Sequence, residues 1–370
     1  MKTIDDIKAV VYQEIDSDNP MVRRFAALRG KEIIACSTED EMERAVDTLK
    51  VKGIPSKEVV ILKRFMGRLS QKCPGSPGMI CCNYLLLNTG FNCLYNCTYC
   101  YLNYYLNSFG ITQFINIEVS FRELPRLSPI GASTVRVGTG EYTDSLMFDE
   151  VTGIGSSLIG AAARNCSVFL ELKTKSDNVE HLLDVREKGN AVLAWSLNTP
   201  RNIALYEQGS ADLDRRIAAA SAACRAGYLT AFHFDPIILH KGWVDEYLGI
   251  VDLLFRAVDP ERVAWISLGC FRYSPGFREI IRDVFPDQAL TAAEMFPGPD
   301  GKFRYLKKNR ISVYSALLNR IRSYSRAPFV YLCMETGDVW RDVFDADYHA
   351  SDDLERAFIS HLEREFLRKI

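Results

Sequence analysis

Three cysteines lie close together in the run Cys93-Leu-Tyr-Asn-Cys97-Thr-Tyr-Cys100. Cysteine thiolates hold iron–sulfur clusters, and a loop this short brings all three within reach of one cluster. Zinc sites use paired C-x2-C units with a fourth ligand, and ferredoxin runs have other spacings and a fourth cysteine. The spacing therefore predicts a [4Fe-4S] cluster with three protein ligands. The alternative is three cysteines that pack as small apolar side chains.

A four-iron cluster with three protein ligands has one iron without a protein ligand. That iron can bind the amino and carboxylate groups of S-adenosylmethionine and pass an electron to the sulfonium, which releases a 5′-deoxyadenosyl radical. The sequence thus predicts an enzyme with two cofactors, the cluster and S-adenosylmethionine. Such an enzyme also needs an external electron donor, such as flavodoxin or ferredoxin, to reduce the cluster.

The composition is that of a folded enzyme without a strong charge bias. The chain has 370 residues, of which 48% are hydrophobic, and a formal net charge of −2. This charge gives no general attraction to nucleic acid or to an anionic membrane. No apolar run approaches the roughly 18 residues of a membrane span, and no signal peptide is visible. The 11 cysteines indicate thiols and a metal cluster rather than disulfides. We expect a cytoplasmic protein without membrane contact.

Residues 1–75 have the pattern of a small α/β extension. Apolar runs at 31–36 and 57–62 predict strands, and the segment between them starts with Ser37-Thr38 followed by carboxylates, as helices often do. The Pro- and Gly-rich run Cys73-Pro-Gly-Ser-Pro-Gly78 then marks a boundary.

Residues 76–320 alternate short apolar runs with helical patterns. Six alternating units predict an α/β fold with a partial (β/α)6 TIM-like barrel, in which catalytic groups lie at the C-terminal ends of the strands. Residues 321–370 are expected to add a strand and an amphipathic helix that pack on the barrel. The six expected strands are 84–87, 134–137, 168–172, 192–195, 228–234 and 263–268.

Several ordered motifs in this region resemble the spore photoproduct lyase family of radical-SAM enzymes. The resemblance covers about residues 60–315 and implies a radical-SAM barrel, one cluster, S-adenosylmethionine and lyase activity that cleaves a carbon–carbon bond of a UV-induced thymine dimer in DNA. The motifs are Lys72-Cys-Pro-Gly-Ser-Pro-Gly-Met-Ile-Cys-Cys-Asn-Tyr84, Glu171-Leu-Lys-Thr-Lys-Ser176, Trp195-Ser-Leu-Asn198, Ala226-Gly-Tyr228 and Pro236-Ile…His240-Lys-Gly-Trp243.

The resemblance also implies roles for single residues. The three cysteines match the cluster ligands, and a lysine at a strand end suits the carboxylate of S-adenosylmethionine. Hydroxyl and amide groups suit its ribose and methionine moieties. The matching positions are Tyr99 beside the adenine, and Lys175, Ser196 and Asn198 as further cofactor contacts.

The chain departs from the family at the end of the second barrel strand. Where family members carry a hydrogen-donor cysteine, this chain reads Gly138-Thr-Gly-Glu-Tyr-Thr-Asp-Ser145. Its Gly140-Glu141 step resembles the element with which other radical-SAM enzymes bind the methionine ammonium. We assign this role to Glu141, with Thr143 or Asp144 as supporting contacts. The alternative is a carboxylate on a surface loop.

A substrate radical must still be quenched. Candidate catalytic residues are Tyr101 and Tyr142, while Cys270 is the candidate substitute thiol because it follows the sixth strand; regeneration of the cofactor is a further route. A second cluster at Cys73, Cys81 and Cys82 is an alternative, although the family has the same cysteine pattern with one cluster.

Substrate contacts are expected from polar and aromatic groups near the strand ends. The segment 302–310 interleaves cations with aromatic residues, which suits phosphates and stacked bases, although a solvated helix start has the same pattern. His233 is either a substrate contact or a core histidine. The candidates are His233, Asp235, Arg272, Tyr273, Arg304 and Tyr305.

Two enzymatic functions remain open. The first is repair of a DNA photolesion by a radical-SAM lyase. The second is radical-SAM modification of a free nucleoside, nucleotide or other small metabolite, favoured by the absent donor cysteine and the polar pocket. A non-enzymatic iron–sulfur sensor is disfavoured, because cofactor-binding positions accompany the cluster motif.

Overall fold

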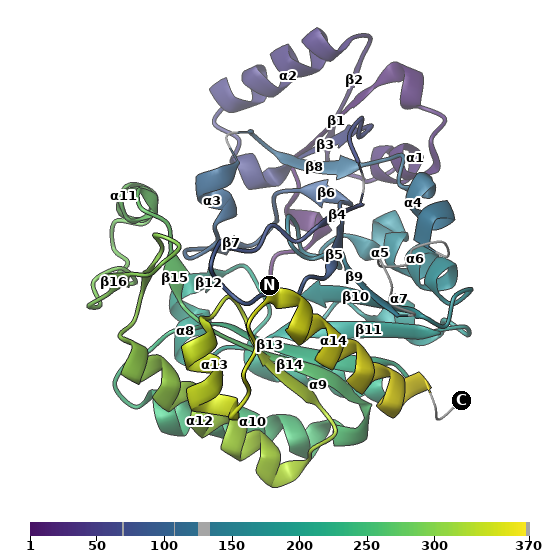
Figure 1. Ribbon diagram of the computed structural model, residues 1–370. Coiled ribbons are helices and arrows are strands. Elements are labelled where there is room, and N and C mark those ends of the chain that lie inside the picture. Colours follow the sequence, from purple (N-terminus) through teal and green to yellow (C-terminus); the bar gives the residue numbers. More distant parts are fainter. Residues whose placement is uncertain (69, 107, 125–133, 368–370) are drawn as a thin grey trace.

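The computed structural model describes residues 1–68, 70–106, 108–124 and 134–367, and its strands form two main sheets (Figure 1). The strands of the first sheet are β1 (Ala9–Gln13), β2 (Glu32–Cys36), β3 (Val59–Lys63), β6 (Gly90–Phe91) and β8 (Ile111–Phe114). The strands of the second are β4 (Ser70–Lys72), β5 (Leu85–Leu87), β9 (Val135–Gly138), β10 (Val168–Thr174), β11 (Asn190–Ser196), β13 (Leu229–Ile237), β14 (Val263–Cys270) and β18 (Phe329–Leu332).

Short strands and helices complete the described chain. The short strands are β7 (Asn96–Cys97), β12 (Glu207–Gln208), β15 (Arg272–Tyr273), β16 (Phe296–Pro297) and β17 (Phe303–Arg304). The α-helices are α1 (Pro20–Ala26), α2 (Glu39–Val51), α3 (Leu102–Tyr105), α4 (Glu118–Glu123), α5 (Asp149–Thr152), α6 (Ile154–Ala162), α7 (Glu180–Leu183), α8 (Pro200–Tyr206), α9 (Leu213–Arg225), α10 (Trp243–Ala257), α11 (Phe277–Val284), α12 (Lys307–Tyr324), α13 (Gly337–Phe344) and α14 (Ser351–Leu362). No helix in these ranges is long and apolar enough to cross a membrane.

The N-terminal sheet has the strand order β2-β1-β3-β8-β6. The predicted strand, helix and strand are present, and the Thr38 side chain caps α2 by accepting a hydrogen bond from the Glu41 amide. The apolar strand β1 was not predicted. Strands β8 and β6 come from residues 90–114, so this sheet also holds both ends of the segment that carries the three cysteines. The division at residue 75 stays a prediction.

The second sheet is the partial barrel that the sequence predicts. All six expected strands occur, as β5, β9, β10, β11, β13 and β14, and each pairs in parallel with its neighbour in this order. Strands β11 and β14 are buried along their whole length, which explains their continuous apolar runs. The last predicted strand, β18, extends the sheet as a seventh parallel strand beside β14.

The C-terminal helix α14 packs against residues in the first halves of the barrel strands, and Figure 1 shows it in yellow in front of the sheet. Its Phe358 ring lies with its centroid 4.2 Å from that of Phe329, at the start of β18, and 5.5 Å from that of Trp265 in β14. The Arg136 guanidinium of β9 lies 3.8 Å from the Phe358 ring centroid. Helix α14 therefore forms a floor under the barrel, opposite the strand ends where chemistry is expected.

Candidate active site

The cysteine loop is held by backbone pairing with β12 and by a side-chain contact from Lys57. Strand β7, which contains Cys97, pairs antiparallel with β12, so that Cys97 lies opposite Glu207. The Thr98 amide donates to the Tyr206 carbonyl at 2.9 Å, and Lys57 Nζ donates to the Tyr95 carbonyl at 2.6 Å. The loop is thus fixed against β12 and against the segment that precedes β3.

The three thiols fit an iron–sulfur cluster in chemistry and sequence spacing. Cys97 is buried, whereas Cys93 and Cys100 are half-buried. Burial raises the pKa of Cys93 to about 12 and raises that of Cys97 as well, which a bound metal would offset by its positive charge. Among the described residues no group of three His, Cys, Asp or Glu is placed to hold a single metal ion. Ligands of a four-iron cluster bind different irons, so they need not converge on one point.

Four of the predicted cofactor residues lie around the buried ion pair of Glu207 and Arg216. They are Tyr99, Lys175, Ser196 and Asn198. Tyr99 donates its phenolic hydrogen to Glu207, and Arg216 Nη2 lies 2.5 Å from Glu207 Oε2. The Arg216 Nη1 group also donates to the Ser196 carbonyl at 2.9 Å, and the Lys175 ammonium lies 5.7 Å from the Tyr99 ring centroid.

The amide group of Asn198 is fully engaged within the protein. Its Nδ2 donates to Glu207 Oε1 at 3.3 Å and to the Pro236 carbonyl at 3.2 Å. Its Oδ1 accepts a hydrogen bond of 2.7 Å from the Tyr247 hydroxyl. Asn198 therefore holds the end of β11 in place and has little remaining capacity for a cofactor.

Sequence reasoning missed Glu207 and Arg216. Although burial raises the pKa of the Glu207 carboxyl, Arg216 and Lys175 outweigh this effect and hold the pKa below its ordinary value. A signal was present, because Arg216 lies between Leu213 and Ile217 on the buried face of α9. A fully buried arginine needs an acidic partner.

The loop after β9 brings Glu141 next to the cysteine loop. The Tyr101 hydroxyl, one residue after Cys100, donates to the Glu141 carbonyl at 2.9 Å. Asp144 anchors this loop by accepting hydrogen bonds of 2.7 Å from Thr174 Oγ1 and from the Lys175 amide. Thr143, a supporting contact expected from the sequence, is buried.

The Glu141 carboxylate also reaches the barrel interior. Its Oε2 lies 3.7 Å from Lys173 Nζ. Burial lowers the pKa of Lys173, but Glu141 and Glu171 raise it more strongly, so the net shift is upward. Glu141 therefore stands between the cysteine loop and the barrel interior.

A cavity of about 90 Å³ lies inside the barrel at the strand ends, and ion pairs line it. His233 Nε2 lies 2.6 Å from Glu171 Oε1, and the Trp265 indole donates to the same oxygen at 3.0 Å. Arg272 Nη1 lies 3.2 Å from Asp235 Oδ1. The structure thus brings three predicted substrate residues, His233, Asp235 and Arg272, to one cavity.

Glu171 is the partner that sequence reasoning did not assign to the site. Burial alone would raise the pKa of its carboxyl. The opposite effect of His233 is larger, so that the pKa falls to about 2. The carboxylate is therefore ionised at neutral pH, although it is buried.

The thiols that line this cavity do not include Cys270, which the sequence analysis selected as the candidate substitute thiol. Cys73, Cys81, Cys82 and Cys333 line it, and Arg272 Nη2 lies 3.2 Å from Cys333 Sγ. Cys270 is buried, and its amide donates to the Tyr314 hydroxyl at 2.8 Å.

The two candidate tyrosines differ in their surroundings. Tyr142 accepts a hydrogen bond from Gln71 at 3.3 Å and packs edge-on against Phe91. Tyr101 lies between the cysteine loop and the Glu141 loop. The catalytic roles of Tyr101, Tyr142 and Cys270 stay predictions.

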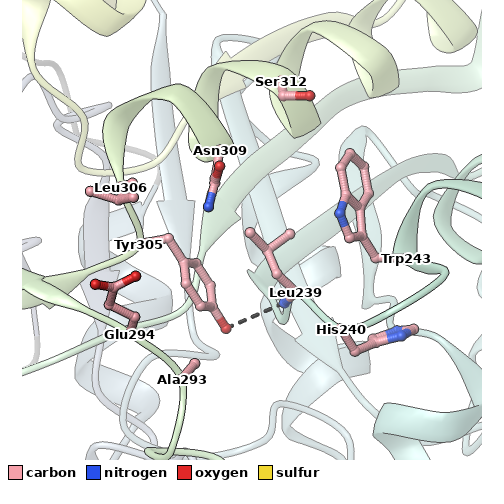
Figure 2. A pocket seen from close by; sticks show the side chains of 9 residues that line it. All are labelled: Leu239, His240, Trp243, Ala293, Glu294, Tyr305, Leu306, Asn309 and Ser312. Atoms are coloured by element: carbon pink, nitrogen blue, oxygen red, sulfur yellow. Dashed lines mark hydrogen bonds between the residues drawn. The ribbon is translucent and has the colours of Figure 1, made fainter.

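The remaining predicted substrate residues lie outside the barrel cavity. Tyr305 lines a second pocket of about 490 Å³ between the β13–α10 connection and α12, together with Trp243 and Asn309 (Figure 2). The Leu239 amide donates a hydrogen bond of 3.3 Å to the Tyr305 hydroxyl. Tyr273 stacks on Phe303, with centroids 5.3 Å apart.

The cations of the segment 302–310 are mostly engaged in intramolecular contacts. Buried Arg304 lies 2.6 Å from Asp300, and Lys307 lies 2.6 Å from Asp338. Lys302 donates to Ser76 Oγ at 2.7 Å, and Arg310 lies 2.9 Å from Glu335. Lys308 is exposed. Four of the five cations therefore already have partners, which weakens the expectation that this segment binds phosphates.

Comparisons with known proteins agree on one family. The profile of the spore photoproduct lyase family matches residues 81–313. The spore photoproduct lyase of Clostridium acetobutylicum is 25% identical over 355 residues, which cover 88% of this chain and 98% of that protein. The enzyme of Bacillus subtilis is 26% identical over 206 residues, which cover 55% of this chain and 60% of that protein. This second match thus spans less than two thirds of that relative.

Solved structures show the same fold. A spore photoproduct lyase variant with bound AdoMet and dinucleoside spore photoproduct superimposes with a TM-score of 0.71 at 21% identity, covering 88% of this chain and 98% of that chain. A second spore photoproduct lyase variant gives a TM-score of 0.73 at 21% identity, with the same coverage.

Proposed function

This chain belongs to the spore photoproduct lyase family, a family of radical-SAM lyases, and from that premise we propose that it repairs a thymine-dimer lesion of the spore photoproduct type in DNA. The observation that supports this most is the position of the cysteine loop. It contains Tyr99 and lies beside Lys175 and Glu141, and Glu141 lines the barrel cavity. This order supports a cluster site, a cofactor site and a substrate site that follow one another along the strand ends.

The chain's own residues would hold the two cofactors. When bound, the cluster and S-adenosylmethionine supply a 5′-deoxyadenosyl radical, which abstracts a hydrogen atom from the substrate. Cys93, Cys97 and Cys100 would ligate the cluster, and Glu141 would bind the methionine ammonium as a charge-assisted pair. Lys175 would bind the methionine carboxylate.

The remaining cofactor contacts would come from three residues. Tyr99 would lie against the adenine, and Ser196 and Thr143 would contribute hydroxyl groups. Asn198 would act by holding the strand end rather than by direct contact.

The reacting part of the substrate would face the barrel cavity, whose volume of about 90 Å³ is too small to enclose a whole dinucleoside. A solved spore photoproduct lyase binds the dinucleoside spore photoproduct, which supports a nucleotide-containing substrate for this chain. His233, Asp235 and Arg272 offer hydrogen bonds to the carbonyl and imide groups of pyrimidines. The alternative of a free small metabolite gains no support from the comparisons. An external electron donor such as flavodoxin or ferredoxin would reduce the cluster, and free thiols together with a low-potential cluster suit a cytoplasmic location.

The test is anaerobic reconstitution followed by turnover. We expect about four irons per chain, reductive cleavage of S-adenosylmethionine, and conversion of dinucleoside spore photoproduct to thymidine, because breaking the carbon–carbon bond between the two nucleosides separates them. Cys93→Ala, Cys97→Ala and Cys100→Ala should each abolish cleavage, because each removes one cluster ligand.

Two outcomes would contradict the proposal at different points. Wild-type-like cleavage in any of the three variants would remove that cysteine from the ligand set. Normal cleavage of S-adenosylmethionine without conversion of the photoproduct would reject the substrate and keep the cofactor chemistry.

A further inference from the structure

The ion pair between Glu207 and Arg216 is buried to an unusual degree. The two side chains are 1% and 0% exposed, respectively. A buried pair is costly unless further hydrogen bonds satisfy both groups. Here Arg216 also donates to the Ala211 carbonyl at 2.9 Å, to the Ser196 carbonyl at 2.9 Å and to Ser210 Oγ at 2.7 Å. All three nitrogens of the guanidinium are therefore bound to protein oxygens.

This pair holds the cysteine loop through two independent contacts. The backbone of Glu207 pairs with Cys97 across the β12–β7 ladder. Its carboxylate accepts the phenolic hydrogen of Tyr99, two residues further on. The first contact fixes the backbone at the middle cysteine, and the second fixes the aromatic side chain between Cys97 and Cys100. We refer to Glu207, Arg216 and Tyr99 as the loop clamp.

We propose that the loop clamp positions Cys97 and Tyr99, so that Glu207 and Arg216 are positioning residues for the cluster and for S-adenosylmethionine. This inference rests on the proposed function insofar as the cysteine loop holds a cluster. Hydrogen bonds and charges around a thiolate ligand set the potential and the affinity of a metal site. Loss of the Glu207 charge should therefore change the cluster and cofactor binding more than it changes the rest of the fold.

The chain offers a matched control, a second buried glutamate with the same kinds of contact. Glu335 is buried, lies 2.9 Å from Arg310, and accepts a hydrogen bond of 2.8 Å from the Tyr314 hydroxyl. It is thus a second glutamate held by one arginine and one tyrosine. Its contacts lie on α12 and at the Ile80 bridge, outside the cysteine loop. Glu335→Gln should cost comparable stability without disturbing Cys97.

The first measurement uses the protein without its cluster. The rate at which Cys97 is alkylated under anaerobic native conditions reports local opening of the loop. We expect Glu207→Gln to raise this rate on the order of tenfold, because a lost charge-assisted hydrogen bond shifts a local opening equilibrium by about that factor. Glu335→Gln should leave it unchanged. Equal rates in Glu207→Gln and the wild type would overturn the loop clamp.

This measurement separates the inference from the proposed function. A wild-type protein that fails to load four irons would count against the proposed function, whereas the alkylation of Cys97 would still decide whether the clamp exists. If Glu207→Gln does not fold, Tyr99→Phe removes only the hydrogen bond to the carboxylate and should raise the alkylation rate by a smaller factor. An unchanged rate in Tyr99→Phe would then overturn the inference.

The second measurement uses the cluster-loaded protein. We expect Glu207→Gln to shift the midpoint potential of the cluster and to weaken binding of S-adenosylmethionine, and Glu335→Gln to do neither. Equal potentials and affinities in Glu207→Gln, Glu335→Gln and the wild type would reduce Glu207 to a structural residue and overturn its positioning role.

Discussion

At the residue scale, Glu171 is a buried carboxyl whose charge depends on a partner, His233. Its folded pKa of about 2 lies below the ordinary value of 4.5, since His233 outweighs the effect of burial. A lowered pKa contributes stability that is present above the unfolded value and lost as pH falls through the folded value. The window for this contribution is therefore pH 4.5 to about 2.

The prediction concerns Glu171→Gln, which keeps the shape and removes the charge. We expect it to lower the free energy of unfolding on the order of 3 kcal/mol at pH 7, as measured by urea denaturation. The difference from the wild type should shrink as pH falls from 4.5 towards 2. A difference that stays constant over this range would exclude Glu171 as the titrating group.

Glu141 gives a second prediction at this scale. If its carboxylate binds the methionine ammonium, Glu141→Gln should weaken binding of S-adenosylmethionine by about 1.5–3 kcal/mol while the iron content stays unchanged. Isothermal titration of the cluster-loaded protein measures this loss. Glu43→Gln, on the exposed side of α2, is the control and should bind as the wild type does. An isotherm unchanged within about twofold would place Glu141 outside the cofactor site.

At the element scale, α14 packs against the barrel strands through the buried side chain of Phe358. Phe358 stacks on Phe329, packs against Trp265 and lies under the Arg136 guanidinium. Truncating a buried aromatic side chain costs about 3–5 kcal/mol through lost transfer energy and a remaining cavity. We expect Phe358→Ala to lower the free energy of unfolding by this amount in urea denaturation.

The matched control for Phe358→Ala is a substitution on an exposed helix position. Val51 at the end of α2 is 88% exposed, so Val51→Ala should change stability by less than about 0.5 kcal/mol. If Phe358→Ala lowered the free energy of unfolding as little as Val51→Ala does, α14 would contribute little to the stability of the barrel.

The elements also separate what a single sequence can predict from what it cannot. The six barrel strands and α9 follow local patterns of apolar residues, and the structure has all of them. The pairing of β18 with β14, and of β6 and β8 with the N-terminal sheet, was not predicted, because such pairings join segments far apart in the chain. The resemblance had grouped Tyr99, Lys175 and Ser196 as cofactor contacts. Glu207 was not predicted, because the apolar pattern of α9 indicates a buried arginine at position 216 but does not identify its acidic partner.

At the scale of the whole molecule, the distribution of charge limits how the protein can hold DNA. The formal net charge is −2, and most cations of the segment 302–310 have intramolecular partners. Each phosphate contact made by a cation contributes about −0.9 to the slope of log affinity against log salt concentration. We expect a shallow slope, on the order of −1 to −3, for undamaged duplex DNA.

Fluorescence anisotropy at several salt concentrations measures this slope. Lys308→Ala should make it shallower by at most about 1. Lys52→Ala, on the N-terminal extension and ion-paired with Glu32, is the control and should leave it unchanged. A slope steeper than about −6 would mean that many more cations contact the backbone than the ion pairs leave available.

The floor formed by α14 also has a consequence for the order in which the molecule can be completed. Ribosomes release the chain from its N-terminus, so β9, β14 and β18 emerge before residues 351–362 do. Until those last residues arrive, the aromatic faces of Trp265, Phe329 and Tyr331 have no cover from Phe358. Newly made chains that stop short of residue 351 would therefore expose an apolar surface to chaperones and proteases.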